Sequence, residues 1–329
     1  STLFPYTTLF RSLELEKIIQ PAVKTKRQYH QTKRDIIIDD IRGQEQAKRA
    51  ITIAVAGRHN ILLSGPPGSG KTMLARALNS LLPPLSDSEI IEVTKLHNLD
   101  SNRGDYGIIT DRPFRTPHHT ASRISMIGGG AKATPGEISL AHHGILFLDE
   151  LLEYPRTTLE SLRQPLEDKQ ITISRAQGKY YYPANFMLVA TMNPCPCGYL
   201  GDPEKSCRCS STQILNYQKR LSGPLLDRID LTINVSRVAH KDLLSHKSSS
   251  NSQHKQFENM IKIARTLQAN RYGSSDKYNA SLGSNSVDKI TTLTAEAKQF
   301  LLAATKKLDL SARGYFKVIK ELKDRKSVV

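Results

Sequence analysis

The stretch NILLSGPPGSGKT, residues 60–72, decides the fold of this chain. Asn60–Ser64 has the apolar composition of a short buried strand, and Lys71–Leu82 has the pattern of a helix that ends before Pro83. The loop that joins them fits the pattern G-x-x-x-x-G-K-[ST]. A glycine-rich loop between a strand and a helix predicts a binding site for the phosphates of a nucleotide. Its residues are Gly65, Pro66, Pro67, Gly68, Ser69, Gly70, Lys71 and Thr72.

Each part of this loop has a physical role in binding ATP and Mg²⁺. The glycines let backbone N–H groups approach the phosphates, and the positive end of the helix dipole favours their negative charge. Lys71 is expected to reach the β and γ phosphates, and the Thr72 hydroxyl is expected to bind Mg²⁺. The alternative, a glycine-rich turn without a ligand, is disfavoured by the strand and the helix on either side.

Two further apolar strands end in polar side chains. ILFLDE, residues 145–150, is expected to place Asp149 in the Mg²⁺ shell and Glu150 where it orients and polarises the attacking water. FMLVAT, residues 186–191, is followed by Asn193, whose amide could position the same water; a turn-forming Asn-Pro is the alternative. Short apolar strands that alternate with helices predict an α/β fold with a parallel sheet covered on both faces.

The composition sets the number of domains and the cellular location that we expect. With 329 residues and 38% hydrophobic residues, the chain is long enough for about two domains. No apolar run reaches the length of a membrane span, and no secretory signal pattern is present. We therefore expect a cytoplasmic protein that does not enter the membrane.

The chain divides into five segments by composition and periodicity. Both ends resemble translated sequencing-adapter DNA and are expected to be foreign, which indicates a fragment of a longer protein. The strands stop after Val238, and three stretches of helical periodicity follow. The expected segments are a foreign tail (1–12), a linker (13–34), an α/β nucleotide-binding domain (35–240), a small all-helical lid truncated at its end (241–323) and a second foreign tail (324–329).

Positive charge lies mainly outside the strand-rich segment. The chain has a net charge of +16, with +4 over residues 13–34, +2 over 35–240 and +8 over 241–323. A basic flank suits a polyanion such as DNA, but it is equally compatible with solvated helix faces.

Taken together, these motifs resemble AAA+ ATPases of the magnesium-chelatase-like branch, and the YifB/ComM group in particular. The resemblance covers essentially all of residues 13–323. Beyond the motifs already quoted, it rests on PGEISLAHH (135–143), MNPCPCG (192–198), LLDRIDL (225–231) and LSARGY (310–315). It implies a P-loop AAA+ core with a small helical lid, assembled as a homo-hexameric ring.

The resemblance also assigns roles to three polar residues. Asn193 corresponds to sensor 1, Arg228 to the arginine finger that reaches the γ-phosphate of a neighbouring subunit, and Arg313 to the sensor 2 arginine of the lid. A planar cation suits both arginine roles, because charge spreads over the phosphate oxygens during hydrolysis. A surface or lid salt bridge is the alternative for each arginine.

Two insertions into the core are candidate DNA-binding elements. Ser125–Thr134 is a glycine-rich loop that carries Lys132, and the alternation over Ile171–Pro183 predicts a hairpin with Arg175 and Lys179 near its tip. In ring helicases that resemble this branch, such a hairpin projects into the channel and contacts the phosphate backbone. Tyr180–Tyr182 could stack on bases, although packing on the core is the favoured interpretation.

Cysteine and histidine clusters raise the question of a metal. Cys195 and Cys197 are separated by nine residues from Cys207 and Cys209, a compact set of four thiols. These thiols could bind structural Zn²⁺, but the usual pair spacing is C-x₂₋₄-C rather than C-x-C, so four reduced thiols are the alternative. The pairs at 118–119 and 142–143 lack ligand partners at suitable spacing, which disfavours a metal there.

Three functions are compatible with this sequence. The first is an ATP-driven motor on single-stranded or branched DNA, a helicase or branch-migration translocase in competence and recombination. The alternative is a magnesium-chelatase-type ATPase that remodels a partner protein, and the two share the whole nucleotide site. A Lon-like protease is a third interpretation, but residues 13–323 offer no Ser-Lys dyad in a suitable context.

Overall fold

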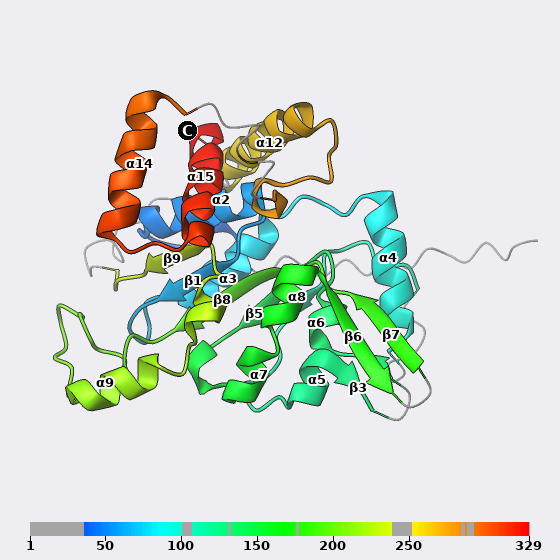
Figure 1. Ribbon diagram of the computed structural model, residues 1–329, viewed down its shortest axis with the longest axis horizontal. Helices are drawn as coiled ribbons and strands as arrows, with labels where there is room; N and C mark the ends of the chain where they lie inside the picture. The colour runs from blue at the N-terminus through cyan, green and yellow to red at the C-terminus, as the bar shows by residue number, and fades with distance from the viewer. Residues whose placement is uncertain are drawn as a thin grey trace, which may run out of the picture.

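A five-stranded parallel sheet forms the centre of the molecule, with helices on both faces (Figure 1). The computed structural model describes residues 36–100, 107–130, 133–175, 178–238, 252–283, 287 and 293–328. The strand order is β2-β5-β8-β1-β9, and every neighbouring pair is parallel. The strands are β1 (Ile61–Ser64), β2 (Phe114–Arg115), β5 (Ile145–Leu148), β8 (Met187–Met192) and β9 (Leu231–Asn234). This architecture confirms the predicted α/β class.

Alternate residues of the central strands enter two separate cores. Ile61 and Leu63 of β1 pack in one hydrophobic cluster with helices α2 and α3, whereas Leu62 packs in the other. The same alternation holds along β5 and β8. Continuous apolar strands are therefore needed, because each side chain must meet a covered face. The helices of this part are η1 (Ile38–Asp40), α2 (Glu45–Gly57), α3 (Lys71–Ser80), α4 (Asp87–Asn98), α5 (Arg123–Ile127), α6 (Glu137–Leu140), η2 (Leu151–Glu153), α7 (Arg156–Glu160), α8 (Arg163–Asp168), α9 (Ser211–Gln218) and α10 (Gly223–Leu226).

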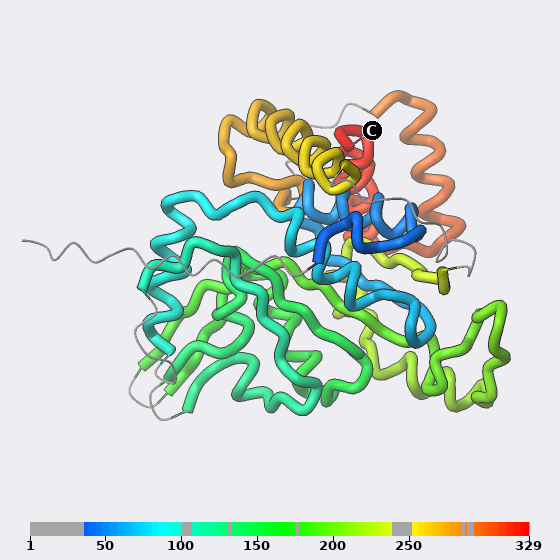
Figure 2. Tube along the Cα trace, turned by 180° about the vertical axis from the view of Figure 1, so that it is seen from behind, coloured from blue at the N-terminus to red at the C-terminus, as the bar shows by residue number. Residues whose placement is uncertain are grey.

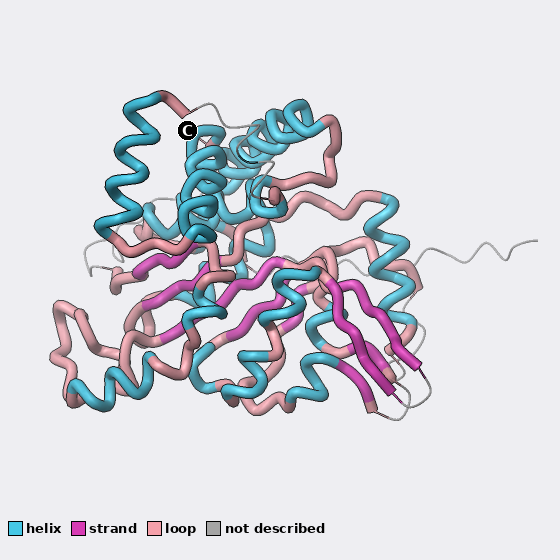
Figure 3. The backbone as a smooth tube through the Cα atoms, in the orientation of Figure 1, coloured by secondary structure: helices cyan, strands magenta, loops and turns pink. Residues whose placement is uncertain are grey.

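The two predicted insertions form small antiparallel sheets of their own. Strands β6 (Gln170–Arg175) and β7 (Gly178–Pro183) make the predicted hairpin, in which Arg175 is opposite Gly178. Strands β3 (Gly128–Gly129) and β4 (Thr134–Pro135) pair in the glycine-rich segment. Figure 3 shows the β6–β7 hairpin extending away from the central sheet, close to β3.

Helices make up the C-terminal part, as predicted. They are α12 (Ser252–Tyr272), η3 (Asn279–Ser281), α14 (Ala295–Lys307) and α15 (Ala312–Ser327). Helix α12 lies beside α2 (Figure 2), where Gln268 donates a hydrogen bond to the carbonyl oxygen of Ala56. Ile261 and Ala264 of α12 join the same hydrophobic cluster as α2. None of the helices in the described ranges has both the length and the apolar character needed to cross a bilayer.

The predicted foreign ends have different outcomes in the structure. Residues 1–12 and the predicted linker, 13–34, lie outside the described residues. At the other end, α15 continues to Ser327, and the carboxylate of Asp324 is fully buried. It accepts hydrogen bonds from Gln268 and Asn279 and forms an ion pair of 2.7 Å with His59. The segment boundaries, including the assignment of 324–329 as foreign, stay predictions.

Candidate active site

The phosphate-binding loop lies where β1, an interior strand between β8 and β9, ends and α3 begins. Gly68 and Gly70 have φ angles of +76° and +86°, in the left-handed region that favours glycine. Gly65 is required for another reason, because a Cβ at this position would lie 2.1 Å from the carbonyl oxygen of Val235. The backbone therefore favours glycine at both glycine positions of the phosphate-binding pattern, Gly65 and Gly70, and also at Gly68.

Lys71 lies within hydrogen-bonding distance of the loop and of the next strand. Its ammonium donates to the carbonyl oxygens of Gly65 at 2.8 Å and Pro66 at 2.9 Å, and to Asn193 Oδ1 at 3.2 Å. Burial lowers the pKa of Lys71, while the carboxylates of Asp149 and Glu150 act in the opposite direction. The structure thus brings Lys71 and Asn193 together at the end of β1 and β8, as the sequence predicted.

Asp149 is held in place from two sides. Its Oδ2 accepts a hydrogen bond of 3.3 Å from the hydroxyl of Thr72, and its Oδ1 accepts one of 2.5 Å from the hydroxyl of Thr191. A hydroxyl and a carboxylate on adjacent elements are oxygen ligands of the kind that Mg²⁺ prefers. Thr72 and Asp149 therefore fit the predicted magnesium site.

Thr191 contacts the candidate magnesium site, and the sequence analysis did not identify it. Its buried hydroxyl also accepts a hydrogen bond of 3.0 Å from the backbone N–H of Glu150. Glu150 has a φ of +53°, and its side chain is exposed directly after β5. A threonine near the end of an otherwise apolar strand, FMLVAT, was the available signal.

Arg228 and Arg313 lie at the other end of the sheet from the phosphate-binding loop. Asn60, the residue before β1, donates a hydrogen bond of 2.8 Å to the carbonyl oxygen of Arg228, so Arg228 is at the amino end of β1. The phosphate-binding loop follows the carboxyl end of the same strand. Since a strand rises about 3.3 Å per residue, the length of β1 separates the two by roughly 13 Å or more.

A single glutamate brings the two arginines together. Glu167 of α8 forms an ion pair with the guanidinium of Arg228 and a second one, at 2.5 Å, with Arg313 of α15. The hydrogen bond from Arg228 lowers the pKa of Glu167. Both arginines line a cavity of about 670 Å³ with Lys317 and Lys320. None of these four residues lines the cavity of about 470 Å³ beside the phosphate-binding loop, which we call the P-loop pocket.

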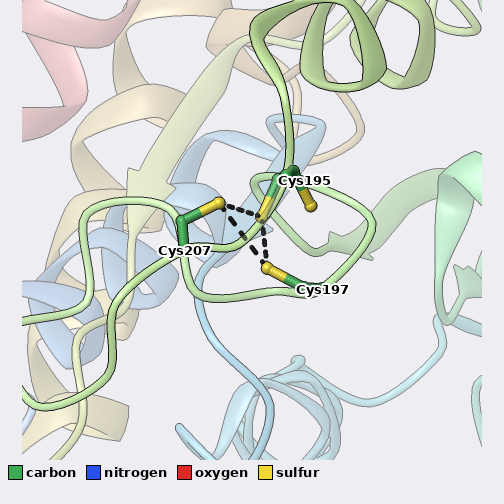
Figure 4. A group of neighbouring side chains, drawn as sticks. Cys195, Cys197 and Cys207 are labelled. Atoms are coloured by element: carbon green, nitrogen blue, oxygen red, sulfur yellow. Dashed lines mark hydrogen bonds between the residues drawn. The ribbon is translucent and has the colours of Figure 1, made fainter.

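Four cysteine sulfurs converge in the loop that follows β8. Figure 4 shows the side chains of Cys195, Cys197 and Cys207 pointing toward one another. Their sulfurs are 3.4 to 3.6 Å apart, and with Cys209 all four lie within 4.8 Å of one another. Four sulfurs at about 2.3 Å from a tetrahedral Zn²⁺ would be about 3.8 Å apart, so the geometry fits zinc. Backbone N–H groups of Tyr199 and Arg208 lower the pKa of Cys197 to about 6, which favours the thiolate that binds metals.

A second cluster, Glu92 with His142 and His143, has the composition of a metal site, but hydrogen bonds occupy both ring nitrogens of His142. His142 Nδ1 accepts a hydrogen bond of 2.9 Å from the backbone N–H of Asn185. A neutral ring with that acceptor carries its proton on Nε2, which lies 3.1 Å from Glu92. His142 therefore has no free lone pair for a metal in this arrangement, but Glu92 lies close to both histidines and is a ligand partner that the sequence analysis did not predict.

The basic side chains of the hairpin are exposed at its end. Lys179 is opposite Ser174, and Arg175 is the last described residue of β6. A Cβ on Gly129 would lie 3.1 Å from the guanidinium of Arg175, so the two insertions are in contact. The hydroxyl of Tyr182 donates a hydrogen bond to the carbonyl oxygen of Ala133, which joins them a second time. Lys132 lies outside the described residues.

The prediction that the three tyrosines pack on the core was wrong for two of them. Tyr180 and Tyr181 are 39% and 62% exposed, and only Tyr182 packs against a hydrophobic cluster. The reason is that the hairpin extends beyond the central sheet, so part of β7 has no layer to pack against.

Comparison with known proteins agrees with this geometry. The family described as "Magnesium chelatase, subunit ChlI" matches residues 37–243, and "Magnesium chelatase, subunit ChlI C-terminal" matches 251–321. "Competence protein ComM" of Haemophilus influenzae is 45% identical over 288 residues, which are 88% of this chain and 55% of that protein. "Uncharacterized protein YifB" of Escherichia coli is 43% identical over 288 residues, 86% of this chain and 55% of that protein.

A more distant relative is the "Magnesium-chelatase 67 kDa subunit" of Heliobacterium mobile, 28% identical over 218 residues, 55% of this chain and 32% of that protein. The chain spans about half the length of the two more similar relatives. The family match covers both the sheet with its phosphate-binding loop and the helical part. This chain belongs to the magnesium chelatase subunit ChlI family of AAA+ ATPases.

Proposed function

We propose that this chain is the motor part of an ATP-driven machine that acts on single-stranded or branched DNA, as a helicase or branch-migration translocase in competence and recombination. One observation carries the proposal: an exposed basic hairpin, β6–β7, is inserted between the strand that ends in Asp149 and the strand that precedes Asn193. The hairpin leads through Ala184 into the amino end of β8, so β8 links it to Asn193 at the carboxyl end of the same strand. The name of the Haemophilus influenzae relative supports a role in competence.

In this proposal each residue at the carboxyl ends of β1, β5 and β8 has one task. Lys71 donates to the β and γ phosphate oxygens, and Thr72 and Asp149 hold Mg²⁺, which neutralises phosphate charge when bound. Glu150 takes up the proton of the attacking water, and Asn193 orients that water. The contact between Lys71 and Asn193 supports this division, because both must face the γ-phosphate.

We further propose that Arg228 and Arg313 both act on the nucleotide of a neighbouring subunit. The topology supports this, since the two arginines lie beyond the amino end of β1, whereas the P-loop of the same chain lies beyond the carboxyl end of β1. A ring in which each subunit presents this end to the next one would place the two guanidinium groups at the neighbour's γ-phosphate. A homo-hexamer is the expected assembly, and a monomer would be inactive.

DNA affinity should depend on the tip of the hairpin. Replacing Arg175 and Lys179 by alanine removes two exposed cations, so we expect weaker binding of fluorescein-labelled single-stranded DNA in an anisotropy titration. The slope of log K against log salt should become shallower by about 1.4, since each phosphate contact on a single strand contributes about 0.7.

The matched control is Lys306→Ala/Lys307→Ala, which removes the same charge from the exposed last turn of α14. We expect this control to keep the original slope. An equal loss in both variants would mean that DNA is bound by the overall positive charge and not by the hairpin.

The second candidate is a chelatase-type ATPase that remodels a partner protein, and the family match favours it. The nucleotide site would be the same in both cases. The two proposed functions differ in whether DNA changes the rate of ATP hydrolysis, because DNA is not a substrate of a protein-remodelling ATPase.

We also propose that the four cysteines hold a structural Zn²⁺. The support is the convergence of four sulfurs at distances that a tetrahedral ion would bridge. The loop between β8 and α9 contains no helix or strand, and zinc would cross-link its two ends.

A further inference from the structure

The cysteine loop, residues 195–209, lies directly against the phosphate-binding loop. Gly198 has a φ of +84°, and a Cβ at this position would lie 2.5 Å from Cδ and 2.8 Å from Cγ of Pro67. Pro67 is the third residue of the G-x-x-x-x-G-K-[ST] loop. Gly198 is also adjacent to Cys197, one of the four candidate zinc ligands. The thiol cluster and the P-loop are therefore in contact through a single residue.

A second contact joins the cysteine loop to the P-loop pocket. The carboxylate of Asp202, whose side chain is fully buried, forms an ion pair of 3.0 Å with Nε of Arg237. Glu204 lies 3.4 Å from Nη1 of the same guanidinium, and both Glu204 and Arg237 line the P-loop pocket with Pro67 and Gly70. One wall of this pocket thus consists of the cysteine loop and the arginine that it holds.

Hydrophobic packing contributes little to the order of this loop. Of its fifteen residues only Cys195 and Gly198 are buried, and no part of it is helix or strand. Ordering a residue of backbone costs about 1–2 kcal/mol, which an exposed loop without a core cannot offset from burial. A metal ion that binds four of its side chains could supply that free energy.

From these contacts we infer that Zn²⁺ in the cysteine loop builds one wall of the ATP pocket, so that zinc raises the affinity for ATP and ATP raises the affinity for zinc. The inference rests on the proposed zinc site and on ATP as the ligand of the P-loop, and it does not depend on DNA. In the zinc-bound loop, Gly198 packs against Pro67, and Asp202 holds Arg237 beside the P-loop pocket by their ion pair. Thermodynamic linkage requires that the two affinities change by the same factor.

The first test compares ATP binding by the same chain with and without zinc. Zinc content is measured on the purified chain, and a zinc-selective chelator then removes the ion while Mg²⁺ stays in excess. We expect one Zn²⁺ per chain, a loss of affinity for a fluorescent ATP analogue of about tenfold on zinc removal, and recovery on adding Zn²⁺ back. Zinc affinity should rise by the same factor when ATP is present.

The second test separates the contact from the metal. Gly198→Ala introduces a Cβ that collides with Pro67, so it should keep one Zn²⁺ and still lose about tenfold in ATP affinity. Gly201→Ala is the matched control, because Gly201 is in the same loop with a φ of +78° and has nothing within 4 Å of an added Cβ. It should keep both zinc and ATP affinity, although its backbone strain is the same.

Several outcomes would overturn the inference. A chain that binds zinc but has the same ATP affinity with and without it would show that the loop is not part of the pocket. An unchanged ATP affinity in Gly198→Ala would show that its contact with Pro67 does not affect ATP binding. So would a loss of ATP affinity in Gly201→Ala equal to that in Gly198→Ala. A chain without zinc would refute the metal site itself, and none of these results would bear on whether the motor acts on DNA.

Discussion

Replacing Glu150 by glutamine is expected to lower the rate constant of ATP hydrolysis by about 10³-fold, with ATP affinity within about twofold of the original. Glutamine keeps the size of the side chain but cannot accept the proton of the attacking water. Binding should persist, because the carboxylate follows Asp149 of the candidate Mg²⁺ site and we expect Lys71 and the backbone of the P-loop to hold the phosphates. Single-turnover hydrolysis and binding of a fluorescent ATP analogue measure the two quantities separately.

Glu153→Gln is the matched control for this substitution. Glu153 lies three residues further along the chain, in η2, and its side chain is 43% exposed and paired with Arg220. The two variants lose the same charge from the same turn, yet only Glu150 follows β5 next to Asp149. If Glu153→Gln lost as much activity as Glu150→Gln, general electrostatics rather than a positioned base would explain the effect.

A mixture of two inactive chains, Arg228→Ala and Glu150→Gln, is expected to hydrolyse ATP. The first chain has an intact phosphate-binding loop and lacks the finger, and the second has the finger and lacks the base. With random mixing in a ring, about a quarter of the interfaces in an equimolar mixture would combine the two intact halves. Arg228→Ala alone should hydrolyse ATP about 10³-fold more slowly than the unaltered chain, as expected for an arginine that stabilises transition-state charge in trans.

Arg313→Ala should behave in the same way when it is mixed with Glu150→Gln, because Glu167 holds both arginines at the same end of the sheet. Arg163→Ala serves as the control, since Arg163 is on α8 with Glu167 but pairs with Glu160. Arg163→Ala should hydrolyse ATP at the full rate without being mixed with Glu150→Gln. A mixture that stays inactive, in a chain shown to form rings, would mean that the arginines do not act across the interface.

The sequence was sufficient to predict the sheet and to place most of the candidate nucleotide-site residues at one edge of it. Short apolar strands leave little choice of fold, because each one must be covered on both faces. The site follows from the fold, since Asp149 and Asn193 come directly after strands of a parallel sheet and Lys71 follows the loop at the end of a third strand. The carboxyl ends of such strands meet at one edge, so local motifs that are distant in the chain become neighbours there.

The relations that the sequence did not predict are contacts between segments that carry no shared pattern. Glu167 meets Arg228 and Arg313 from positions 61 and 146 residues away, and nothing in the sequence marks this glutamate. The contact of Gly198 with Pro67 depends on how one loop is placed over another. Thr191 is a similar case, because a strand-end threonine is equally compatible with a purely structural role.

The most direct measurement of the central claim is the rate of ATP hydrolysis by this chain with and without forked DNA, with Glu150→Gln as the blank. We expect several-fold stimulation by DNA, and we expect Arg175→Ala/Lys179→Ala to lose that stimulation while keeping the rate without DNA. A rate that is the same with and without DNA in the unaltered chain would contradict a DNA motor and favour the ATPase that remodels a partner protein.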